Sequence, residues 1–188
     1  MAISSARYTK IKLILYKCSI YALALFFIGI AQVSFFSKIN VLGATPDLLL
    51  AATAALCIKE DHRVASICGI ISGFLYCSLG GIKYPIYILF SFLCAYCLKI
   101  VALRSFGTNF PSFCALALIA FGAKAIFNIV DTSIFSNSFV VFRALWQIAL
   151  PELISSALFC SLSYFIISIL SNLINKKSKS RKDKGINE

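Results

Sequence analysis

The sequence has few charged residues and almost none of the side chains that enzymes use for hydrolysis or metal binding. Only 13% of its 188 residues are charged, against about 25% in a soluble domain. The single histidine, His62, lies in a charged segment, so no Ser-His, Cys-His or His-metal site can form within the apolar runs. No glycine-rich phosphate loop is present. We therefore expect no catalytic, cofactor-binding or metal-binding residues and no enzyme activity.

The eight cysteines do not predict disulfides, because almost all of them lie inside apolar segments. There a thiol packs as a small, polarisable apolar group. Cys94 and Cys97 share one helix face, but neither a second cysteine pair nor a histidine lies near them in the sequence. Ordinary packing is therefore favoured over a redox or metal site.

Long apolar runs dominate the chain, with 60% hydrophobic residues and a mean hydropathy of +0.90. The charges cluster between these runs, as in proteins that cross a membrane several times. We predict an all-α integral membrane protein of about six transmembrane helices, without a separate soluble domain. The predicted spans are residues 13–36, 41–58, 64–79, 84–103, 112–131 and 151–174, between basic tails at residues 1–12 and 175–188.

The prolines support this division, because each stands at the start of a predicted span and none interrupts one. They are Pro46, Pro85, Pro111 and Pro151. We expect Thr45 to cap the second helix and Pro46 to open it. Asp47 and Glu152 then fall in the first turns of their helices, where the helix dipole favours a carboxylate.

The distribution of Lys and Arg predicts that both termini lie in the cytoplasm. With six spans and this orientation, 14 of the 18 Lys and Arg residues are on the inner side and 3 on the outer side, as the positive-inside rule requires. The basic tails are expected to attract anionic lipids. Nucleic-acid binding is not expected, because the basic C-terminal tail lacks aromatic stacking residues and any recognisable nucleic-acid-binding fold.

The segment at residues 132–150 is aromatic and partly polar. Such a composition is typical of a helix or loop that lies at the outer membrane interface. A seventh span there would break the charge rule.

Small residues form a stripe along the third span, at spacings of 3, 4, 4 and 3 residues. The stripe consists of Ser66, Gly69, Gly73, Cys77 and Gly80, and Gly81 follows it. A stripe of this kind lets another helix approach closely in lipid. It predicts either packing within the bundle or a face that binds a partner protein.

The fifth span carries a polar stripe, with Lys124, Asn128 and Asp131 at positions i, i+4 and i+7. A lysine near the middle of a span usually faces protein or water. Because helical side chains tilt toward the N-terminus, Lys124 points away from Asp131. Asn128 or a group on another helix must then satisfy Lys124, unless it snorkels toward the headgroups. The stripe either stabilises the bundle or contacts a ligand or partner.

One region resembles the MreD family of bacterial membrane proteins. It spans roughly residues 32–96, about a third of the chain. Its matching features are Gln32-x-Ser34, then Pro46-Asp47-Leu48-Leu49, then Gly69-x-x-x-Gly73-Phe74-Leu75, then Gly80-Gly81, then Ala95-Tyr96. Members of the family often carry an Asp four residues after the second glycine, where this chain has Cys77. We therefore assign no functional role to Cys77.

The resemblance implies a non-catalytic scaffold in the bacterial plasma membrane. Its implied partners are an MreC-like membrane protein, the wall-building synthases and an MreB-type filament. The alternative is a small-molecule binding subunit of a transporter, similar to the substrate-binding components of energy-coupling-factor transporters. In that case Lys124, Asn128 and Asp131, with the aromatic segment at residues 132–150, would line an outward pocket. A small transporter of another kind is a third reading, but the spans show no internal repeat.

Overall fold

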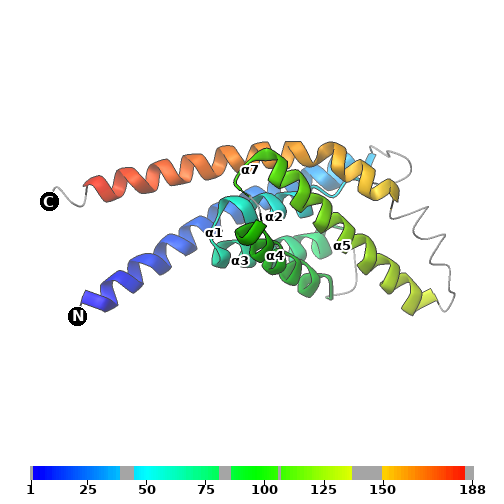
Figure 1. Ribbon diagram of the computed structural model, residues 1–188, viewed down its shortest axis with the longest axis horizontal. Helices are drawn as coiled ribbons and strands as arrows, with labels where there is room; N and C mark the ends of the chain where they lie inside the picture. Colours follow the sequence, from blue (N-terminus) through cyan, green and yellow to red (C-terminus); the bar gives the residue numbers. More distant parts are fainter. Residues whose placement is uncertain (1, 39–44, 81–85, 106, 137–149, 185–188) are drawn as a thin grey trace.

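The computed structural model describes residues 2–38, 45–80, 86–105, 107–136 and 150–184. Within these ranges the chain is helical and contains no strand. The elements are α1 (Ala2–Ser34), the 3-10 helix η1 (Phe36–Lys38), α2 (Leu48–Lys59), α3 (His62–Gly80), α4 (Ile86–Ser105), α5 (Phe110–Ser136) and α7 (Leu150–Lys184), as Figure 1 shows. The prediction of an all-α membrane protein is confirmed.

Five of these helices, α1, α3, α4, α5 and α7, are long and apolar enough to cross a membrane. The outer two are longer than their predicted spans, because α1 begins at Ala2 and α7 continues to Lys184. The predicted basic tails are thus largely continuations of α1 and α7. The first and last described residues lie at the same end of the molecule (Figure 1).

The short helix α2 is the centre of the bundle. Every residue from Leu48 to Ile58 is buried, and α2 packs against each of the other five helices. Its 12 residues rise only about 18 Å, against about 30 Å for the hydrocarbon core. The prediction that residues 41–58 form one helix that crosses the whole membrane was therefore wrong. Thr45 and Pro46 precede the helix, because a residue before proline is disfavoured in helical conformation.

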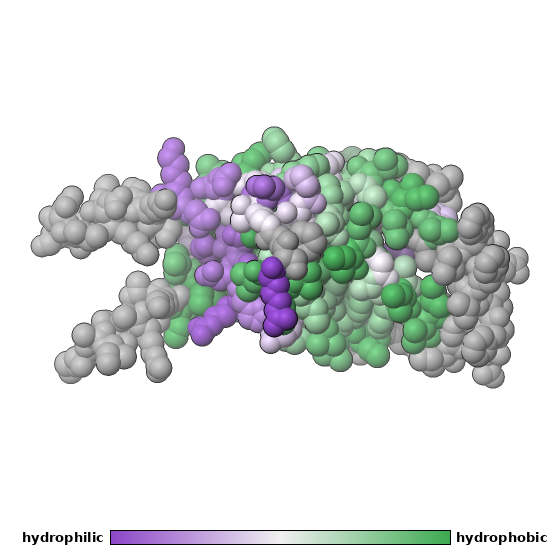
Figure 2. Space-filling model, in the orientation of Figure 1, coloured by the Kyte–Doolittle hydropathy of each residue, from purple (hydrophilic) through white to green (hydrophobic). Residues whose placement is uncertain are grey.

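The surface divides into an apolar part and a hydrophilic band. Figure 2 shows the band toward the end where the termini lie, and mainly hydrophobic residues over the larger remainder of this face. Large apolar side chains such as Phe27, Leu158 and Phe165 are more than half exposed. Such a surface is stable against lipid and would be costly in water.

Helices α3 and α4 approach closely where the small-residue stripe of α3 meets α4. A Cβ atom at Gly69 would lie 2.6 Å from Cβ of Ala95, and one at Gly73 would lie 2.9 Å from the backbone of Ile88. These two glycines therefore serve packing inside the bundle. Ser66 bonds back to the carbonyl of His62 at 2.9 Å. Gly80 is the last residue of α3, and Gly81 lies outside the described residues.

We expect Gly73→Ala to lower the thermal unfolding midpoint of the protein in detergent. The new methyl group meets the α4 backbone at 2.9 Å, and overpacking of this kind costs about 1–3 kcal/mol. Gly122→Ala is the matched control, because no atom lies within 4 Å of the position of its Cβ. Equal midpoints for the two variants would show that the contact between α3 and α4 is loose.

Candidate functional site

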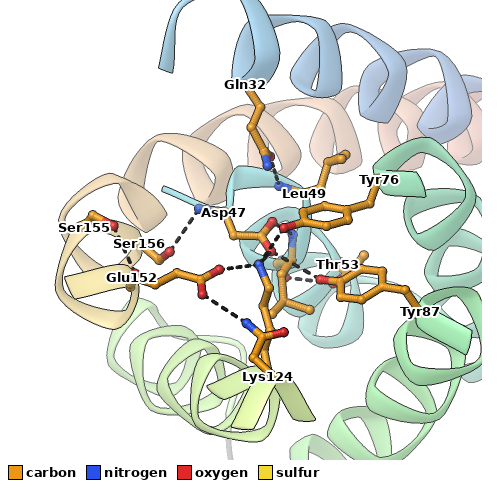
Figure 3. Close-up of polar contacts among 12 residues, drawn as sticks. Gln32, Asp47, Leu49, Thr53, Tyr76, Tyr87, Lys124, Glu152, Ser155 and Ser156 are labelled. Atoms are coloured by element: carbon orange, nitrogen blue, oxygen red, sulfur yellow. Dashed lines mark hydrogen bonds and ion pairs between the residues drawn. The ribbon is translucent and has the colours of Figure 1, made fainter. Parts of the chain in front are cut away.

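The N-terminus of α2 lies inside the protein, and side chains from three helices satisfy its backbone. Gln32 of α1 accepts a hydrogen bond from the backbone N–H of Leu49 at 3.0 Å. The Asp47 carboxylate accepts from the N–H of Leu50 at 3.0 Å, and Ser156 of α7 accepts from the N–H of Asp47 at 2.9 Å. Figure 3 shows these contacts. They replace the water that would cover a helix end in a soluble protein.

Asp47, and not Thr45, caps this helix. Because α2 begins at Leu48, Asp47 occupies the N-cap position, where a carboxylate oxygen can bond to a first-turn N–H. Thr45 stands two positions earlier and is exposed. The prediction that Thr45 is the cap and Pro46 the first helical residue was wrong, because the helix starts two residues later than expected.

Lys124 of α5 is the cation at the centre of the site. Its side chain is only 3% exposed, and its Nζ atom lies 2.5 Å from Asp47 Oδ2 and 2.5 Å from Glu152 Oε1. It also donates to the Tyr76 hydroxyl at 3.0 Å. These contacts use all three N–H groups of the ammonium. Lys124 is thus satisfied by groups on other helices, one of the outcomes expected from the sequence.

Two further side chains surround these charges. Tyr87 of α4 donates a long hydrogen bond of 3.4 Å to Asp47, and its ring stacks on that of Tyr76 with centroids 4.3 Å apart. Asn128 donates to Glu152 Oε2 at 3.1 Å. We refer to Asp47, Tyr76, Tyr87, Lys124, Asn128 and Glu152 as the Lys124 cluster. It joins α2, α3, α4, α5 and α7.

The charges of the cluster are close to balance. It contains two carboxylates and one lysine, but both acids lie at the start of a helix. Asp47 caps α2, and Glu152 stands in the first turn of α7. Each helix N-terminus supplies roughly half a positive charge, so the two termini together offset the second carboxylate. This arrangement lets three charged groups remain at membrane depth, where an unpaired ion would be costly.

The space beside the cluster is small. A cavity of about 10 Å³ lies between α5 and α7, lined in part by Lys124, Glu152 and Ser156. This volume suffices for about one water molecule, whereas pockets for small-molecule ligands measure roughly 300–1,000 Å³. Because Lys124 is bonded to Asp47, Glu152 and Tyr76, the cluster holds helices together, and the cavity beside it among the described residues is too small for a ligand of this kind.

Two of the three predicted stripe residues, Lys124 and Asn128, belong to the cluster. Asp131 lies in α5, and its side chain lies outside the described part of the structure. The sequence reasoning missed Glu152 and Asp47 as partners of Lys124, and missed Tyr76 and Tyr87 entirely. The predicted topology did contain a signal for the two acids. It places Asp47 and Glu152 at the outer ends of their spans, and it places Lys124 in the outer half of the fifth span.

A second buried acid, Glu60, lies at the other end of α2. It is 3% exposed and accepts hydrogen bonds from Tyr21 at 2.6 Å and Ser171 at 2.9 Å. Lys17 pairs with it at 2.6 Å and also donates to Asn175 at 2.9 Å. An acid is unfavourable at a helix C-terminus, so the pairing with Lys17 compensates for this placement. Glu60 thus joins α1, α2 and α7.

We expect Lys124→Met to destabilise the protein strongly. The change leaves Asp47 and Glu152 buried without their cation, and breaking a buried ion pair costs about 3–5 kcal/mol. Thermal unfolding in detergent measures the loss, with Lys38→Met at an exposed lysine as the control. Adding Asp47→Asn and Glu152→Gln to Lys124→Met should restore part of the stability, because no charge then remains unpaired. A triple variant no more stable than Lys124→Met would contradict the electrostatic explanation.

Glu60→Ala should also lower the unfolding midpoint, because it leaves the fully buried Tyr21 hydroxyl without its acceptor. An unsatisfied buried polar group costs about 1–3 kcal/mol. Lys38→Ala, at an exposed lysine outside the contacts of Glu60, provides the control. If the two alanine variants unfold at the same temperature, Glu60 does not hold α1 and α7 to α2.

Among the described residues, no group of three or more His, Cys, Asp or Glu side chains is placed to hold a metal ion. The eight cysteines are free thiols. Comparison of the chain with protein-family models, with curated proteins and with solved structures gives no match.

Proposed function

We propose that this protein is a non-catalytic scaffold subunit in the membrane of a bacterial cell-wall elongation complex, as its resemblance to the MreD family implies. Its partners would be an MreC-like membrane protein, the wall synthases and an MreB-type filament. Its place would be the bacterial plasma membrane, with both termini in the cytoplasm. The positive-inside rule supports this orientation.

One observation supports the proposal above the others: the residues that carry the resemblance contact one another at the centre of the bundle. Gln32 bonds to the backbone of Leu49, and Asp47 caps the same helix. Gly69 packs against Ala95. Motif positions that are far apart in the sequence therefore form pairs in space. If the resemblance were only a chance similarity of apolar composition, there would be no reason for its motif positions to contact one another in pairs.

The alternative of a small-molecule binding subunit has less support. It relied on Lys124, Asn128 and Asp131 lining an outward pocket, together with the aromatic segment that follows α5. Lys124 and Asn128 bond instead to side chains of neighbouring helices, and the adjacent cavity of about 10 Å³ is far below the size of a vitamin pocket. Residues 137–149 of the aromatic segment lie outside the described residues.

The test is a pull-down of the tagged protein from its native membrane in a gentle detergent, with the bound proteins identified by mass spectrometry. An unrelated tagged protein with several membrane spans, from the same membrane, is the control. We expect specific recovery of a single-span MreC-like protein together with wall synthases. Recovery of transporter ATPase subunits with a shared coupling subunit would instead favour the alternative and overturn the scaffold proposal.

A further inference from the structure

Helices α1 and α7 run antiparallel and contact each other near both ends of their membrane-spanning parts. Toward the termini, Lys17 of α1 donates a hydrogen bond to Asn175 of α7 at 2.9 Å. At the opposite end, the rings of Phe36, just after α1, and Phe159 of α7 meet edge to face at 5.1 Å. The two contacts are about 28 Å apart along α1, from the rise per residue, which is close to the full thickness of the hydrocarbon core.

Between these two contacts the helices enclose an apolar cavity of about 470 Å³. Its α1 wall includes Ala24, Phe27 and Ala31, and its α7 wall includes Ile166, Ile169 and Leu170. The cavity opens toward the surrounding membrane, because Phe27 is 62% exposed and Ile169 is 47% exposed. All its lining residues are apolar, which suits a hydrocarbon group as the occupant in a bilayer.

Basic residues lie just beyond the end of the cavity that is nearer the termini. Lys17 stands seven residues before Ala24, and Lys176 stands seven residues after Ile169. A spacing of seven places residues on the same helix face, so both lysines continue the cavity walls. Lys17 is neutralised by Glu60, whereas Lys176 is exposed. Lys176 also begins a stretch of α7 to Lys184 that contains six basic residues and one acid.

The dimensions fit the acyl chain of one phospholipid. From Lys176 to Ile166 the helix rises about 15 Å, which is half of the roughly 30 Å core. A chain whose headgroup lies beside Lys176 therefore ends near Ile166, at the bilayer midplane.

We propose that this cavity binds one acyl chain of an anionic phospholipid from the leaflet at which the two termini lie, with the lipid phosphate next to Lys176. The cavity selects a hydrocarbon chain by shape and apolar lining, and the basic part of α7 selects the negative headgroup. This site does not depend on the proposed function. A failed pull-down of wall-synthesis partners would leave it untouched.

The test uses the full chain in nanodiscs that contain equal amounts of phosphatidylglycerol and phosphatidylcholine, followed by native mass spectrometry of the lipids that remain bound. We expect one retained phosphatidylglycerol per protein. Ala24→Phe, which fills the cavity, should abolish this retention, whereas Leu23→Phe at the exposed neighbouring position should keep it. Lys176→Gln should reduce the preference for phosphatidylglycerol about fivefold, as for loss of one lysine at an anionic surface, and Lys38→Gln should not.

A second measurement on the unaltered chain keeps the test independent of whether Ala24→Phe folds. Phosphatidylglycerol with a photoreactive group at the end of its acyl chain should label the cavity walls near Ala31 and Ile166, at the bilayer midplane. Equal retention of both lipids, or labelling spread evenly over the exposed apolar surface, would overturn the proposal. So would a protein partner cross-linked through position 24, since the occupant would then be a polypeptide.

Discussion

A helix that ends inside a bilayer leaves backbone N–H groups that lipid cannot satisfy, and this constraint governs the whole structure. Helix α2 ends in this way, because its twelve residues are too few to cross the membrane. Asp47 caps its first turn. The carboxylate of Asp47 in turn requires a cation, which Lys124 supplies, and Lys124 is balanced further by Glu152. The start of one short helix thereby fixes the relative positions of its neighbours.

The opposite end of α2 follows the same logic with different residues. Glu60 lies where the helix dipole disfavours an acid, and Lys17 and Tyr21 of α1 together with Ser171 of α7 stabilise it. Both ends of the central helix are therefore bound to outer helices by polar contacts, while its sides are apolar. In lipid, where apolar burial gives little preference for one helix neighbour over another, such contacts specify which helices pack together.

Much of this fold could be predicted from the sequence, because hydropathy and proline positions report on each span separately. The length of α2 could not be predicted in this way. The hydropathy of the apolar run at residues 41–58 does not depend on whether its first residues are helical or extended. Hydropathy therefore could not show that the helix starts only at Leu48. The partners of Lys124 were missed for a related reason. Asp47 lies 77 residues away, and no periodicity within one helix shows which helices are neighbours. The stripe of Gly69 and Gly73 was easier to interpret, since the helix it packs against, α4, is the next in the chain.

The contacts of α2 also bear on how the protein is made. A ribosome delivers α2 to the membrane long before α5 and α7, yet Lys124, Glu152, Ser156 and Ser171 all belong to those later helices. Until they arrive, the buried carboxylate of Asp47 lacks its cation, whereas Glu60 already has Lys17 and Tyr21 of α1 as partners. The N-terminal end of α2 therefore reaches its final environment only when α7 has been synthesised, so this end of the bundle is completed late, after the opposite end has already made contacts with α1.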